Sequence, residues 1–150
     1  MTHTFRSHYF HVVWSTKDRS GLITKDLKPI LFTYLGSIIK YNHGELLAAG
    51  GTDDHIHLLI CLNLPENYTL LIRELKVSST IWINQHHPCD KRFAWQEGYG
   101  SFSLGYSDVK KTKEHIQNQE KHHKQYSFDD EYIKMLEAHE ISFDERTALG

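Results

Sequence analysis

The chain has 150 residues, of which 39% are hydrophobic and 24% charged, so it can bury one core and has the composition of a globular domain. It has no apolar run long enough to span a membrane and no signal-peptide pattern. Cys61 and Cys89 stand apart, so we expect a cytoplasmic protein without a thiolate zinc site. The net charge of −2 is uneven, because residues 127–150 hold seven acidic and two basic side chains, which leaves 15 basic and 12 acidic residues in 1–126. A mildly basic body permits phosphate binding without requiring it.

Strands and helices alternate in the predicted first half of the chain. Aromatic and β-branched residues predict a strand at 9–14, and the polar residues that follow predict a loop ending at Gly21. Apolar residues at steps of three and four then predict a helix over 24–42 with one buried face. Short strands are expected at 45–49 and 55–60, joined as an antiparallel hairpin.

The second half continues the alternation. We expect a second helix over 68–85, strand segments at 93–96 and 101–104, a third helix capped by Ser107, and a terminal helix over 128–140. No internal repeat or linker interrupts this order. The mixture favours an α+β sandwich, in which helices pack on one largely antiparallel sheet.

Two histidines stand out in the predicted strand at 55–60. Successive side chains in a strand alternate between faces, so His55 and His57 point to one side while Ile56 and Leu58 point to the core. Two imidazoles that project together from a rigid strand offer half of a site for a divalent metal. The alternative is a pair of histidines on a solvated face of the sheet.

The third predicted helix offers a further ligand. His115 and Gln119 are four residues apart and share a helix face, which His122 continues, whereas Ile116 can face the core. The side chain of Gln119 can supply a carbonyl oxygen to a metal, although amides are weak ligands. The residues alone favour an exposed polar helix over a metal-binding face.

Four short blocks resemble the single-tyrosine HUH transposases, of the small insertion-sequence and REP-associated type. They are VVWSTKDR at 12–19, DHIHLL at 54–59, WQEGYGSFS at 95–103 and IQNQEKHH at 116–123. They occur in order, each on the element predicted above, and the resemblance covers nearly the whole chain.

The resemblance implies a ferredoxin-like sandwich that binds single-stranded DNA hairpins, often as a homodimer, and cleaves and rejoins one strand. It implies that His55, His57 and Gln119 hold Mg²⁺ or Mn²⁺, which would stabilise charge on the scissile phosphate. We expect residues 1–126 to form the transposase-like domain and the acidic residues 127–150 to add a helix and tail to it. The basic residues that we assign to DNA binding are Lys17, Arg19, Arg73, Lys76, Lys110 and Lys111.

The chain departs from this family at one position. The attacking tyrosine of the family precedes the helix glutamine by four residues, and His115 occupies that position here. His115 is therefore an inactivating change in a DNA-binding protein, a fourth metal ligand, or a nucleophile itself. If the helix continues, Tyr126 lies about 10 Å beyond Gln119 along its axis, and Tyr106 reaches the site only if its turn folds back.

Three functions follow from these observations. The first is a transposase-type protein that binds hairpin DNA beside a metal site, with strand cleavage and rejoining implied by the resemblance. The second is a catalytically inactive hairpin-binding protein put to another use. The third is a metal-binding domain that never meets nucleic acid. Salt-dependent affinity for hairpin DNA separates the first two from the third, because contacts with phosphates release counterions.

Overall fold

The computed structural model describes residues 3–123 and 126–144. Strands and helices follow one another much as the periodicity predicts. They are β1 (Tyr9–Ser15), α1 (Leu27–Tyr41), β2 (Gly44–Gly51), β3 (His55–Leu62), α2 (Tyr68–His86), β4 (Gly100–Leu104), α3 (Val109–Gln117), α4 (Gln119–His122) and α5 (Phe128–Ala138). Short 3-10 turns precede three of the helices, at Lys17–Arg19, Pro65–Asn67 and Tyr106–Asp108. In the part of the chain described, no helix is both long and apolar enough to span a membrane.

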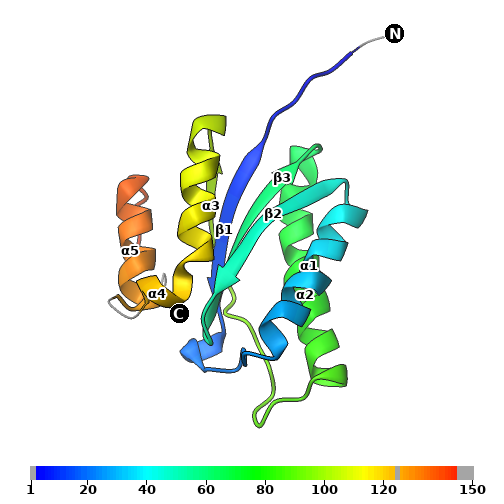
Figure 1. The fold of residues 1–150 in the computed structure, drawn as a ribbon, viewed down its shortest axis with the longest axis vertical. Helices are drawn as coiled ribbons and strands as arrows, with labels where there is room; N and C mark the ends of the chain where they lie inside the picture. The colour runs from blue at the N-terminus through cyan, green and yellow to red at the C-terminus, as the bar shows by residue number, and fades with distance from the viewer. Residues whose placement is uncertain (1–2, 124–125, 145–150) are drawn as a thin grey trace.

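The four strands form one antiparallel sheet in the order β2-β3-β1-β4. The two inner strands are β3 and β1, so the histidine-bearing strand lies in the middle of the sheet (Figure 1). This strand order, with α1 and α2 as crossovers, is the ferredoxin-like arrangement. The predicted fold class is confirmed.

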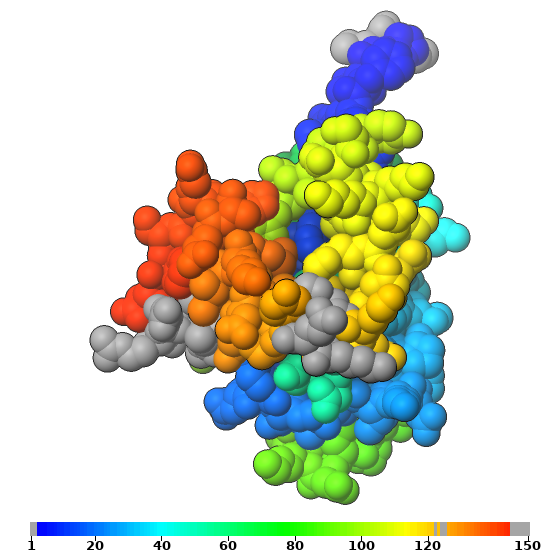
Figure 2. All heavy atoms as spheres, turned by 60° about the vertical axis from the view of Figure 1, so that its left-hand side comes forward, coloured from blue at the N-terminus to red at the C-terminus, as the bar shows by residue number. Residues whose placement is uncertain are grey.

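Helices cover both faces of the sheet (Figure 1). The main core lies between the sheet and helices α1 and α2, where Ile56, Leu58 and Ile60 of β3 are fully buried. On the other face, α3 packs through Ile116 onto β2 and β3, and α5 packs onto β1 and β4. Figure 2 shows α5 in orange beside α3 in yellow, with part of β1 in blue visible between them.

Gly50 lets α3 approach the sheet closely. A Cβ at this position would overlap the backbone carbonyl oxygen of Ile116 and lie 2.9 Å from its carbon. Because both partners are backbone, only a residue without a side chain fits there. Gly50 pairs with His57 in the sheet, so this contact sets the height of α3 above the histidine pair.

Three local predictions are wrong. The segment 93–96 is not a strand, because Trp95 makes only an isolated bridge to Thr16 and its ring inserts edge-on against Trp14. The third helix is not continuous, because Asn118 departs from helical geometry and separates α3 from α4. Ser107 does not cap it, since the helix starts after Asp108 without a side-chain cap.

Candidate functional site

The two histidines of β3 lie on the sheet face opposite the main core, under α3, α4 and α5. The side chains of His55 and His57 are both fully buried, and the ring of Phe128 stacks on His55 with centroids 4.5 Å apart. The solvated-face alternative is therefore wrong. The pair instead occupies a closed polar layer between the sheet and its covering helices.

Gln119 reaches the same layer from α4. Its Oε1 lies 3.0 Å from Nε2 of His55, and its Nε2 donates to the backbone carbonyl of His115 over 3.2 Å. The fold thus brings together the three residues that the resemblance implies as metal ligands. The side chain of His122, predicted on the same stripe, lies outside what the structure describes.

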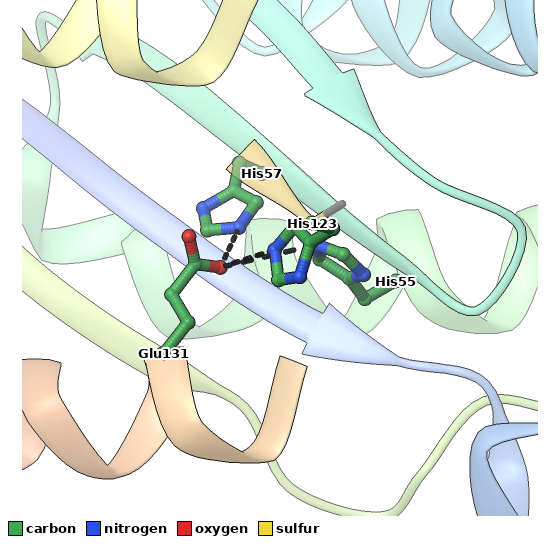
Figure 3. Close-up of side chains that lie close together, drawn as sticks. All are labelled: His55, His57, His123 and Glu131. Atoms are coloured by element: carbon green, nitrogen blue, oxygen red, sulfur yellow. Dashed lines mark hydrogen bonds and ion pairs between the residues drawn. The ribbon is translucent and has the colours of Figure 1, made fainter. Parts of the chain in front are cut away.

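Glu131 of α5 lies at the centre of the cluster and was missed in the sequence. Its Oε1 faces the rings of His57 and His123 (Figure 3) and lies 2.8 Å and 3.1 Å from their Nε2 atoms. A signal was present, because Phe128, Glu131 and Tyr132 follow the three-and-four spacing of a buried helix face. An acid on such an apolar stripe indicates a buried partner.

The cluster combines one carboxylate with several imidazoles in a buried place. Burial by itself would raise the pKa of the Glu131 carboxyl, but hydrogen bonds from His115, His123 and His57 hold it well below its usual value. Burial lowers the pKa of His57 to about 4 despite its bond to Glu131, and lowers that of His11, beside it, to about 3. A carboxylate and neutral imidazoles are the forms that bind metal ions.

His115 points into this cluster from the last turn of α3. Its Nε2 lies 3.0 Å from Oε2 of Glu131, and its ring meets that of His57 edge-on. The position at which the resembled family carries its tyrosine therefore faces the histidine pair. Here the side chain at that position pairs with a carboxylate.

The other candidate tyrosines lie in different places. Tyr106 is 78% exposed and contacts Tyr9, at the end of β1 opposite to the residue that pairs with His55, so its turn does not fold back over the site. Tyr126 does not continue a helix, because α4 ends at His122. It lines a pocket of about 500 Å³ that also borders Asp54 and His123.

One of the predicted DNA-binding residues, Arg19, lies near this pocket, because its guanidinium is 5.3 Å from the ring centroid of Phe128, which lines it. Lys17 is exposed, and Arg19 donates to Asp129 of α5 over 2.8 Å and to Ser15 Oγ over 3.0 Å. The remaining terminal nitrogen of Arg19, Nη2, is buried and has no hydrogen-bond partner within the described residues. The contacts with Asp129 and Ser15 hold the guanidinium between β1 and α5.

The remaining four basic residues lie elsewhere. Arg73 is exposed on α2, across the sheet from the histidines, and Lys76 donates to the backbone carbonyls of residues 96, 97 and 98 over 2.8, 3.0 and 2.8 Å. Burial lowers the pKa of Lys76 to about 8. Lys110 and Lys111 are exposed in the first turn of α3. The six residues do not make one continuous patch, and the bonds of Lys76 hold a loop.

Comparison with known proteins places these features in context. Residues 4–119 match the family model for IS200-like transposases. A crystal structure of a putative transposase from Deinococcus radiodurans R1 is similar, with 20% identity and a TM-score of 0.63 over 79% of this chain and 95% of that one. A REP-associated tyrosine transposase bound to a REP hairpin is also similar, with 15% identity and a TM-score of 0.58 over 77% of this chain and 70% of that one. No curated protein matches. Identities this low establish the fold alone, and the matched region ends at Gln119, before α5.

Proposed function

The chain belongs to the IS200-like transposase family, and from that premise we propose that it binds single-stranded DNA hairpins but does not cleave them. In this proposal His115 forms no covalent bond with the DNA. The observation that carries the proposal is the pairing of His115 with Glu131 at the position where the resembled family has its tyrosine. Nε2 of His115 faces the Glu131 carboxylate, so this nitrogen is not turned toward a phosphate. The carboxylate also repels a phosphate that approaches the same place.

Contacts near the pocket support hairpin binding. The side chain of Arg19 is 17% exposed at the end of β1, and a guanidinium matches the geometry of a phosphate. Lys17 is exposed two residues away. One structure of similar fold is described as bound to a REP hairpin. Together these features favour a phosphate-binding edge at the end of β1.

A divalent cation fits the histidine cluster. His55, His57 and Gln119 provide two imidazoles and an amide oxygen within one buried layer. Mg²⁺ or Mn²⁺ is the cation that the resemblance implies, and of the two Mn²⁺ suits imidazole ligands better. A cation held there supplies Lewis-acid stabilisation of a phosphate where one can reach it.

Binding and cleavage are tested together with a fluorescent single-stranded hairpin and Mn²⁺. The expected result is anisotropy-detected affinity that falls steeply with salt, preference over an unstructured strand of equal length, and no covalent band on a denaturing gel. A covalent band with the wild-type chain would refute the absence of cleavage. Affinity that is undetectable at low salt would leave only the third function, a metal-binding domain without nucleic acid.

A variant pair tests the role of His115. Combining His115→Tyr with Glu131→Gln supplies the missing hydroxyl and removes the carboxylate that faces it, so a covalent adduct should form. The matched control carries Glu131→Gln with His86→Tyr, which adds a tyrosine on α2, across the sheet from the site. No adduct should form there. Equal adduct yields from the two pairs would contradict the assignment of this position.

Metal-assisted cleavage and rejoining, as in DNA transposition, is the second candidate function. The observation that favours it is Tyr126, which is 42% exposed and lines the pocket beside His123. If the wild-type chain does form an adduct, Tyr126→Phe should abolish it. Three earlier expectations stay predictions. They are that the protein forms a homodimer, that it is cytoplasmic, and that residues 127–150 belong to the same domain as residues 1–126.

A further inference from the structure

We propose that His123 and Glu131 join His55 and His57 in a closed four-ligand site for a transition-metal ion of the Zn²⁺ type, which fastens α5 to the sheet. Glu131 lies beyond the region that matches the family model, so this ligand set differs from the trio that the resemblance implies. The closed site would use the same two histidines in place of the Mg²⁺ or Mn²⁺ trio, so the two ligand sets exclude each other. Nothing in the proposal requires DNA, so it stands or falls separately from hairpin binding.

The first observation is that four potential ligand atoms lie close together. The Nε2 atoms of His57, His123 and His55 lie 2.8, 3.1 and 3.9 Å from the same carboxylate oxygen, Oε1 of Glu131 (Figure 3). One ligand atom from each residue lies within 4.8 Å of all the others. Ligand atoms around a tetrahedral Zn²⁺ with bonds of about 2.0 Å are about 3.3 Å apart. Changes of about 0.5 to 1.5 Å in these separations would therefore convert the cluster into a coordination sphere.

The second step is the support behind each imidazole. Nδ1 of His55 bonds to a carboxylate oxygen of Asp54 over 2.8 Å, and Nδ1 of His123 donates to the backbone carbonyl of Tyr126 over 2.7 Å. Nδ1 of His57 meets Nε2 of His11 over 2.8 Å. Metal-binding histidines are held in this way, because a partner at Nδ1 fixes the ring and leaves Nε2 for the metal.

The third step is the balance of donors and acceptors. Nδ1 of His55 faces the carboxylate of Asp54, and its Nε2 faces Oε1 of Gln119 over 3.0 Å. A neutral imidazole carries one N–H and cannot donate to both oxygens. His123 repeats the pattern, with a carbonyl on one side and Glu131 on the other. A cation near Nε2 of His55 resolves this excess of acceptors there. At His123 a second ring proton does so in the metal-free protein, because, although burial opposes the shift, Glu131 raises the pKa of that ring.

The donor set selects the metal. Three imidazoles and one carboxylate suit Zn²⁺ and similar ions, whereas Mg²⁺ prefers oxygen ligands and water. Four protein ligands also complete a tetrahedral site, as in structural zinc centres, and leave no open position for a phosphate. Gln119 is then a positioning residue that contacts His55 from the side.

The test is a Zn²⁺ titration of the chelator-treated full chain without DNA, with competition against a chromogenic chelator as the readout. We expect one tight site, a higher melting temperature on Zn²⁺ addition, no competition by Mg²⁺, and strong visible absorption from Co²⁺ typical of four-coordination. Glu131→Gln should weaken Zn²⁺ binding by at least about 100-fold, the upper end of what loss of an outer-sphere partner costs.

The matched control is Glu137→Gln, which makes the same change on the exposed part of α5 and should bind Zn²⁺ like the wild type. His123→Gln provides a second ligand variant in case Glu131→Gln loses its fold by circular dichroism. Zn²⁺ affinity of a folded ligand variant within about threefold of the control would overturn the proposal. A weak, six-coordinate Co²⁺ spectrum from the wild type would do so too.

Discussion

Replacing Gly50 by alanine should push α3 away from the sheet and loosen the site below it. The new Cβ would overlap the carbonyl oxygen of Ile116 and lie 2.9 Å from its carbon, whereas ordinary contacts begin at 3.4 Å. Neither backbone partner can rotate aside, so the helix has to retreat by about 1 Å to restore normal contact distances. Ile116 is fully buried against Ala48 and Leu59, and that packing is lost in part.

The expected cost is about 2–3 kcal/mol in the free energy of unfolding, near the upper end for overpacked cores. The retreat also carries Gln119, three residues after Ile116, beyond hydrogen-bonding distance of His55, from which it is now 3.0 Å away. Urea unfolding followed by circular dichroism measures the first effect. Zn²⁺ affinity measured with the competing chelator reports the second, and we expect it to fall.

Gly98→Ala is the matched control, because a Cβ at Gly98 would meet nothing within 4 Å. The same loss of chain flexibility in the unfolded state applies to both variants, and by itself it stabilises by about 0.4–1 kcal/mol. If the Gly50 variant unfolds at the same urea concentration as the Gly98 variant, the close approach of α3 to β2 is not as described.

Two further predictions concern charge. Asp129→Asn should strengthen hairpin binding about 1.4- to 5-fold, which corresponds to the free energy of a surface ion pair, because the Nε donor of Arg19 is released from Asp129. The control is Asp130→Asn, an exposed position one residue later, which should raise the affinity less. Equal affinities of the two variants in anisotropy titrations would contradict this prediction. In metal-free protein, stability should fall as the pH drops from about 6.5 toward 4, because the pKa values of His11 and His57 are lowered from 6.5 to about 3 and about 4. Between these pH values the two histidines take up protons in the unfolded chain but not in the folded one. The free energy of unfolding therefore falls by about 1.4 kcal/mol per pH unit for each histidine. Urea unfolding at pH 7 and pH 5 checks the slope, and equal stabilities at the two values would refute it.

The sequence by itself determined the elements whose periodicity is strong. Alternation placed Ile56 and Leu58 in the core and turned His55 and His57 to the other face, because successive strand residues point to opposite sides. The ferredoxin-like order was implied by the family resemblance, whereas the helix near residues 109–117 and the α+β class followed from the same kind of local pattern. These are short-range rules, and they needed no knowledge of what packs against what.

Only the tertiary structure decided what surrounds the histidines. Glu131 is 74 residues away from His57 along the chain, and the residues next to it in sequence do not indicate which strand it will face. The break at Asn118 and the pairing of Arg19 with Asp129 are likewise consequences of how α4 and α5 turn back over the sheet. A buried polar cluster forms wherever distant side chains satisfy one another best, and that balance is settled between elements rather than within them.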